Sequence, residues 1–121
     1  MTEDDDDEAF DEFMEGIREE FRSGLPAHDA GLAEALALWR TGNAEHRPGA
    51  FRHMIERAHK LSGCGRTFGY PDIGDAAEAL ETALVEVSGA LASAPPAKVL
   101  DLAAQLRAAI ADVVKVSNRI E

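Results

Sequence analysis

The chain has 121 residues, of which 45% are apolar and only one, Cys64, is a cysteine, and its formal net charge is −11. This length favours a single domain, and the negative charge disfavours binding to nucleic acid or to an anionic membrane surface. Because no apolar stretch approaches the roughly 18 residues of a membrane span, and the N-terminus lacks the features of a secretion signal, we expect a cytoplasmic protein.

The N-terminal region predicts a tail and one short helix. Residues 1–8 are almost entirely acidic, and we expect them to form a disordered tail in front of a helical domain over residues 9–121. Apolar residues then recur at helical spacing at Phe10, Phe13, Met14, Ile17 and Phe21. The Ser-Gly-Leu-Pro run at residues 23–26 is expected to end this helix, which would pack across one end of the remaining helices.

The rest of the chain predicts four longer helices, each with an apolar seam in which residues alternate at spacings of three and four. The first covers residues 29–41, and the second begins at Pro48 and ends before Gly69. The third begins at Pro71, and the fourth follows a break at residues 93–96. In chain order, the seam residues are Leu32, Leu36 and Trp39; Phe51, Met54, Ala58, Leu61, Gly65 and Phe68; Ile73, Ala77, Leu80, Leu84, Val87 and Leu91; and Val99, Leu102, Leu106, Ile110, Val113, Ser117 and Ile120.

These patterns define the expected fold class. Short connections between helices with facing seams favour antiparallel neighbours. Runs of β-branched residues with a period of two, which would indicate strands, are absent from the sequence. The predicted fold is therefore all-α, an antiparallel four-helix bundle over residues 29–120 with an additional short N-terminal helix.

His59 is the strongest candidate for chemistry. At about 100° per residue it lies well away from the apolar seam of its helix, so its imidazole is expected to reach solvent. A neutral imidazole nitrogen is available as a nucleophile near neutral pH. Residues 47–66 around it hold five basic residues and one acidic residue. This basic island is either a solvated helix face or a docking surface for an acidic partner.

Gly63 lies one turn from His59 on the same side of the helix. Because glycine in a helix interior costs about 1 kcal/mol relative to alanine, a reason for its presence is expected. The missing side chain would give a partner's active-site loops access to the imidazole; tight helix packing is the alternative, although Gly63 points away from the seam. The same side of the helix also holds Arg52, Ile55, Ser62 and Arg66.

The segment from His59 to Gly69, HKLSGCGRTFG, resembles the H-x-L-K-G-x-x-x-x-x-G signature of histidine phosphotransfer (HPt) domains, particularly those at the front of chemotaxis-type kinases. The histidine, the leucine and both glycines match at the correct spacing. The resemblance implies that His59 is the phosphorylation site. One position departs from the signature, because Ser62 stands where the family usually has a lysine that is thought to meet the phosphoryl group. Arg66 or Lys60 would then take the place of that lysine.

The resemblance also implies a carboxylate that orients the imidazole. In chemotaxis-type members a glutamate on the following helix bonds the second ring nitrogen, so that the outer nitrogen is the nucleophile. Counting without gaps assigns this role to Glu81, with Glu78 one turn earlier. Both residues follow directly after seam residues, as His59 does; solvated surface glutamates are the alternative.

The implied function is that of a phosphorelay intermediate without catalytic turnover of its own. A histidine kinase catalytic domain, or a phosphorylated receiver, would phosphorylate His59, and the group would pass to an aspartate of a response-regulator receiver domain. No cofactor is expected in this chain, because the resemblance implies that Mg²⁺ belongs to the partners' sites. The alternative is a phosphorylation-inactive helical adaptor that binds receiver or kinase domains.

Two further classes of site are disfavoured. His53, Glu56 and His59 form a His-x-x-Glu-x-x-His run, but di-iron bundles use inward-facing pairs from two helices, whereas this run faces outward and has no second pair. No metal site is therefore expected. A nucleophilic hydrolase is not supported, because the sequence has no serine or cysteine motif with a positioned base.

Overall fold

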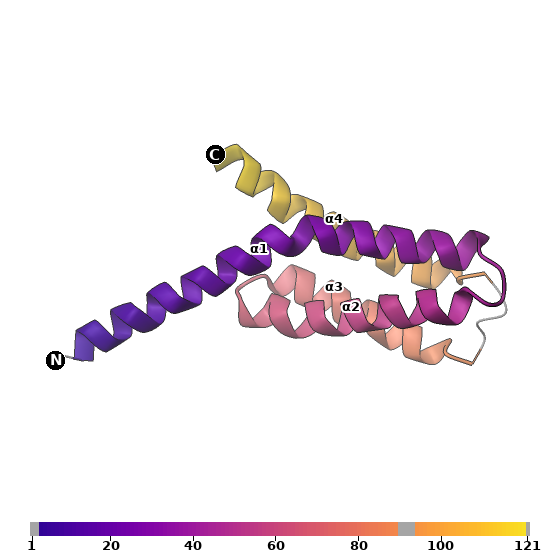
Figure 1. The fold of residues 1–121 in the computed structure, drawn as a ribbon, viewed down its shortest axis with the longest axis horizontal. Helices are drawn as coiled ribbons and strands as arrows, with labels where there is room; N and C mark the ends of the chain where they lie inside the picture. Colours follow the sequence, from indigo (N-terminus) through magenta and orange to yellow (C-terminus); the bar gives the residue numbers. More distant parts are fainter. Residues whose placement is uncertain (1–2, 90–93, 121) are drawn as a thin grey trace.

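The computed structural model describes residues 3–89 and 94–120, and the regular structure of these residues is entirely helical. The helices are α1 (Glu3–Thr41), α2 (Arg47–Thr67), α3 (Pro71–Glu86) and α4 (Ala97–Ile120). Each helix packs against two neighbours: α1 and α3 both contact α2 and α4. Figure 1 shows the resulting antiparallel bundle, which confirms the predicted all-helical fold. Within the described ranges, no helix is both long enough and apolar enough to cross a membrane.

The additional N-terminal helix is not a separate element, so this part of the prediction was wrong. The helix α1 is continuous from Glu3 to Thr41 and contains Pro26 in its interior. The helix continues through residues 23–26 because apolar side chains both before and after Pro26 pack against the core. Leu25 and Leu32 are buried, and Phe21 packs against the same core.

The first part of α1 extends away from the bundle and does not pack across its end (Figure 1). Phe10 and Phe13 are 62% and 63% exposed, whereas Phe21 is in contact with the core. The acidic run that was expected to be a disordered tail is described from Glu3 onward as the first turns of this helix. We refer to residues 3–19 as the acidic arm.

A tight turn at residues 68–70 connects α2 and α3. Gly69 has a φ of +90°, a left-handed conformation that glycine adopts without strain. The backbone N–H of Tyr70 donates to the carbonyl oxygen of Gly65 at 2.7 Å, which is the six-to-one bond of a Schellman C-cap. Pro71 then occupies the first turn of α3, where its missing N–H is harmless. The predicted helix ends at Gly69 and Pro71 are therefore confirmed.

The core consists mainly of the predicted apolar seams, joined by small residues and by Leu25. Leu91 lies outside the described residues, as do the side chains of Ser117 and Ile120. The buried hydrophobic residues are Leu25, Leu32, Ala35, Trp39, Ala50, Met54, Ala58, Leu61, Ile73, Ala77, Leu80, Ala83, Leu84, Val99, Ala103, Leu106 and Ile110.

Aromatic residues close both ends of the bundle. Near the α1–α2 connection, the buried Trp39 meets Phe51 edge to face, with ring centroids 5.9 Å apart. At the other end, the ring of Phe21 lies 5.6 Å from that of Phe68 and 5.8 Å from that of Tyr70. Such pairs contribute about 0.5–1.5 kcal/mol each beyond their buried area. They attach α1 to both ends of α2, the helix that carries His59.

Candidate functional site

His59 lies on the outer side of α2, as its position relative to the seam predicted. Its side chain is 78% exposed, whereas the preceding residue, Ala58, is fully buried. A Cβ built on Gly63, one turn further along, would have no heavy atom within 4 Å apart from its own helix backbone and chain neighbours. The α2 surface beside the imidazole is therefore open, and the close-packing explanation for Gly63 does not apply.

Glu81 of α3 reaches across to the imidazole. The Nδ1 atom of His59 lies 2.6 Å from Oε2 of Glu81, whose side chain is 26% exposed. An ionised carboxylate only accepts hydrogen bonds, so Nδ1 must carry the hydrogen in this contact. For a neutral imidazole, the second nitrogen, Nε2, then has a free lone pair. The contact thus selects the tautomer in which Nε2 has the free lone pair.

Arg66 does not lie free beside the imidazole, contrary to what its helical angle suggested. Its Nη2 atom contacts Oδ1 of Asp75 at 2.9 Å and also contacts the carboxylate of Glu78, both on α3. Hydrogen bonds to Glu78 and Asp75 raise the pKa of the Arg66 guanidinium above its ordinary value. Of the two glutamates proposed to orient the imidazole, Glu78 therefore binds Arg66 in this structure, and Glu81 contacts His59.

Asp75 is a member of the site that the sequence analysis missed. Asp75, Glu78 and Glu81 follow one another at spacings of three, so that they form one carboxylate stripe along α3. This stripe faces Arg66 and His59 of α2. The regular spacing of the three acidic residues beside the seam was the signal that could have identified Asp75.

The other predicted site residues lie on the surface of α2 near His59. Arg52 and Lys60 are exposed, and Ile55 and Ser62 are half-buried. Other basic residues of the island have structural contacts. Nε of Arg47 donates to the carbonyl oxygen of Trp39 at 3.2 Å.

Arg57 belongs to the α1–α2 interface and not to the exposed surface around His59. Its Nη1 atom lies 3.1 Å from Nδ1 of His28 on α1. The guanidinium also lies over Gly31, where a Cβ would come within 2.3 Å of the Arg57 Cζ atom. Part of the basic island is therefore structural, whereas Lys60 and Arg52 are exposed.

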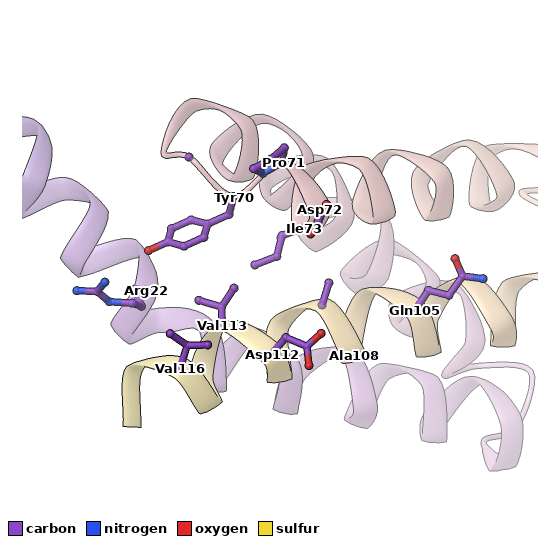
Figure 2. Close-up of a pocket in the computed structure, with 12 residues that line it drawn as sticks. Arg22, Tyr70, Pro71, Asp72, Ile73, Gln105, Ala108, Asp112, Val113 and Val116 are labelled. Atoms are coloured by element: carbon purple, nitrogen blue, oxygen red, sulfur yellow. The ribbon is translucent and has the colours of Figure 1, made fainter. Parts of the chain in front are cut away.

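A groove on the bundle lies away from these residues. It has a volume of about 560 Å³ and opens between α4, the start of α3 and Arg22 of α1. Figure 2 shows Val113 and Val116 of α4 facing Tyr70 across it. None of the predicted site residues lines this groove. Among the residues that the structure describes, no three histidine, cysteine, aspartate or glutamate side chains gather as metal ligands.

Comparison with known proteins gives one result that bears on this site. A family model described as the Hpt domain matches residues 16–115, a span that includes His59, Glu81 and most of the four helices. No curated protein and no solved structure matches the chain. Because the match covers most of the chain, the protein belongs to the Hpt domain family, whose members serve histidine phosphotransfer in phosphorelays.

Proposed function

We propose that this chain accepts a phosphoryl group on Nε2 of His59 and passes it to an aspartate of a response-regulator receiver domain. The observation that carries the proposal is the 2.6 Å contact between Nδ1 of His59 and Glu81 on an imidazole that is 78% exposed. This contact holds the ring in one tautomer and leaves the other nitrogen open to a partner. The absence of any side chain at Gly63 gives that partner access.

The transfer needs little more from this chain than positioning. In the forward step, the Nε2 lone pair forms the N–P bond while the bond from phosphorus to the donor's oxygen breaks, and its electrons leave with that oxygen. The ring gains positive charge, and the Glu81 carboxylate stabilises it through the Nδ1–H hydrogen bond. In the second step a receiver aspartate oxygen attacks phosphorus, and the N–P electrons return to Nε2.

The charges around His59 favour such partners. Lys60 and Arg52 are exposed on α2, and cationic groups near a phosphoryl group lower the energy of its transfer. Receiver active sites are rich in carboxylates, so an exposed basic surface also attracts them. The donor would be a histidine kinase catalytic domain or a phosphorylated receiver, and the proposal retains a cytoplasmic location, where ATP is available to the kinase.

The proposal is tested by mixing the protein with candidate histidine kinase catalytic domains, those of chemotaxis-type kinases among them, and with radiolabelled ATP as the phosphoryl donor. We expect a label on this chain that is acid-labile and stable in alkali, and that a receiver domain then removes. His59→Gln should abolish the label, and His53→Gln, which changes another exposed histidine of α2, should retain it. Label that persists in His59→Gln would contradict the assignment.

The alternative is an adaptor that binds receiver or kinase domains without accepting phosphate. It is favoured by Ser62 in place of lysine and by the engagement of Arg66 with Asp75 and Glu78. Both functions predict binding of a receiver domain. They differ in one result: the adaptor binds the receiver but gives no label in the wild-type protein.

A further inference from the structure

The helices α2 and α3 approach each other closely at two buried glycines, Gly65 and Gly74. A Cβ on Gly65 would lie 2.7 Å from the backbone nitrogen and 3.1 Å from the Cα of Gly74. A Cβ on Gly74 would lie 2.6 Å from Cγ of Arg66 and 3.2 Å from the carbonyl oxygen of Ser62. All four distances are shorter than an ordinary carbon contact of about 3.5–4.0 Å. The two backbones are therefore in direct contact. A larger residue at position 65 would have to move a helix, and a larger residue at position 74 would have to displace the Arg66 side chain.

This contact fixes the register of the two antiparallel helices at the phosphorylation site. Ala58 precedes Gly65 by seven residues, and Glu81 follows Gly74 by seven. Seven residues are about two turns, or roughly 10.5 Å, on both helices, so Glu81 comes level with Ala58 and its neighbour His59. The observed 2.6 Å contact between His59 and Glu81 agrees with this register.

Arg66 reinforces the same register. Its side chain passes over Gly74, because Gly74 has no Cβ, and its guanidinium reaches Asp75 and Glu78 on successive turns of α3. These two ion pairs hold α3 in one rotational orientation relative to α2, and the second of them lies one turn before Glu81. The ion pairs are exposed, with Arg66 45% accessible, so their contribution is secondary to the backbone contact.

We propose that Gly65 and Gly74 are positioning residues for phosphotransfer, which hold Glu81 at hydrogen-bonding distance from His59, with Arg66 as a supporting tie. The proposal rests on the proposed function of His59 and deepens it. An alanine at position 74 must displace the Arg66 side chain and shift the backbone of α2 by a few tenths of an ångström, whereas an alanine at position 65 meets the backbone of Gly74 and must push the helices apart by about 1 Å. A displacement of that size breaks a 2.6 Å hydrogen bond and releases the imidazole to exchange tautomers.

The test compares Gly65→Ala and Gly74→Ala with Gly49→Ala, a control in α2 where a Cβ meets no heavy atom within 4 Å. The first readout is the tautomer of His59 in the unphosphorylated protein, from long-range ¹H–¹⁵N NMR spectra. We expect the Nδ1–H form to dominate in the wild type and Gly49→Ala, and a mixture in the other two variants. The second readout, the rate of phosphoryl acceptance, should fall by about tenfold in both.

A double variant separates positioning from general loss of structure. The atom nearest to a Cβ at position 74 is Cγ of Arg66, which Arg66→Ala removes, whereas a Cβ at position 65 meets backbone atoms. Arg66→Ala should therefore partly restore the tautomer and the rate in Gly74→Ala but not in Gly65→Ala. If Gly65→Ala does not fold, Gly74→Ala and its double variant decide the question alone.

The outcomes distinguish this proposal from the proposed function. A folded Gly74→Ala that keeps the wild-type tautomer and rate would overturn the positioning role, even if His59 is the phosphorylation site. The NMR measurement of the tautomer needs no phosphoryl donor. If the wild-type protein accepts no phosphate, the proposed function is contradicted, but the tautomers of the variants still test whether the glycines position Glu81 beside His59.

Discussion

Ser62 is the residue at which a single charge is expected to change the transfer rate. Arg66, which could replace the missing lysine, is bound to Asp75 and Glu78. An ammonium group at position 62 would lie one turn from His59, and exposed charge pairs contribute about 0.2–1 kcal/mol. Ser62→Lys is therefore expected to accelerate phosphoryl acceptance by roughly two- to fivefold, measured as initial rate of labelling. Ser62→Met, which is similar in length but uncharged, is the control, and an equal gain in both variants would exclude an electrostatic cause.

The two glutamates of α3 near His59 are expected to differ in importance. Glu81→Gln removes the charge that stabilises the ring, and hydrogen bonds to charged groups contribute about 1.5–3 kcal/mol when protected from solvent. Since the Glu81 side chain is 26% exposed, we expect the lower end of this range, a rate about tenfold slower. Glu78→Gln, which changes a ligand of Arg66, should slow transfer by roughly twofold or less. A larger effect at Glu78 would contradict the assigned roles.

His28 makes the stability of the bundle depend on pH. Its half-buried imidazole faces Arg57, and burial, followed by the charges of Arg57 and Lys60, lowers the pKa of His28 below 6.5. As the pH falls, His28 therefore takes up a proton in the unfolded chain at a higher pH than in the folded protein. The free energy of unfolding decreases from about pH 6.5 downward, until the pH falls below the pKa of His28 in the folded protein.

His28→Gln keeps a hydrogen-bond acceptor for Arg57 but does not titrate. We expect the wild type to lose more stability than this variant between pH 7.5 and pH 5.5, measured by urea denaturation at both values. His53→Gln, on the exposed face of α2, should retain the wild-type pH dependence. Equal losses in the wild type and His28→Gln would refute the role of His28.

The sequence predicted the features of single residues that depend on one helix, but not the contacts that depend on how two helices pack together. The exposure of His59 follows from its angle to the seam of its own helix, and the sequence predicted it. The contacts of Arg66 depend on carboxylates of α3, which the angle along α2 does not include. The contact between Gly65 and Gly74 likewise depends on the register between two helices, for which the sequence offers no local signal.

At the scale of single elements, Pro26 is the point where local sequence rules and tertiary packing disagree. The predicted break was wrong because Phe21 and Leu25, on the N-terminal side of the proline, pack against the core. Full burial of such a side chain contributes about 1.5–3 kcal/mol; Leu25 is fully buried, and Phe21 is partly buried. Together they offset the roughly 3 kcal/mol that proline costs in a helix interior. Where no such conflict exists, as at Pro48 and Pro71, the sequence predicted the helix ends correctly.

Replacement of Pro26 tests whether α1 is continuous. If the helix passes through this exposed position, Pro26→Ala restores a backbone hydrogen bond and should stabilise the protein by about 1–3 kcal/mol in urea denaturation. Pro71→Ala is the matched control, because proline is well accommodated in the first turn of α3, and should give no gain. No gain at position 26 would mean that the helix is interrupted there.

At the scale of the whole molecule, the negative charge is concentrated in one place. The acidic arm holds ten acidic residues and one basic residue, so nine of the eleven net negative charges lie within residues 3–19. Residues 20–121 contain 13 acidic and 11 basic residues and have a net charge of −2. The sequence suggested a basic island in an acidic protein; the structure instead separates a nearly neutral bundle from an acidic helical extension (Figure 1). Charge counts alone could not reveal this, because the direction of the arm depends on where α1 begins to pack.

Removal of the acidic arm should therefore change partner association more than stability. A chain that begins at Glu20 retains Phe21 and its contacts with Phe68 and Tyr70, so we expect its unfolding free energy to stay within about 1 kcal/mol of the full chain. A receiver domain with an acidic active site should associate roughly three- to tenfold faster at low salt, because nine net negative charges are removed. The difference should vanish near 1 M salt, where the Debye length is about 3 Å.

Two variants separate charge from bulk in stopped-flow association measurements with the receiver that is active in the relay assay. Replacing Asp4, Asp5, Asp6 and Asp7 by asparagine keeps the length of the arm and should reproduce about half of the gain, since it removes four of the nine net charges. The double variant Phe10→Ala/Phe13→Ala keeps every charge and should leave the association rate unchanged, because both rings are largely exposed. If the phenylalanine variant accelerates association as much as truncation does, the arm obstructs the partner through its apolar side chains, and the electrostatic explanation is wrong.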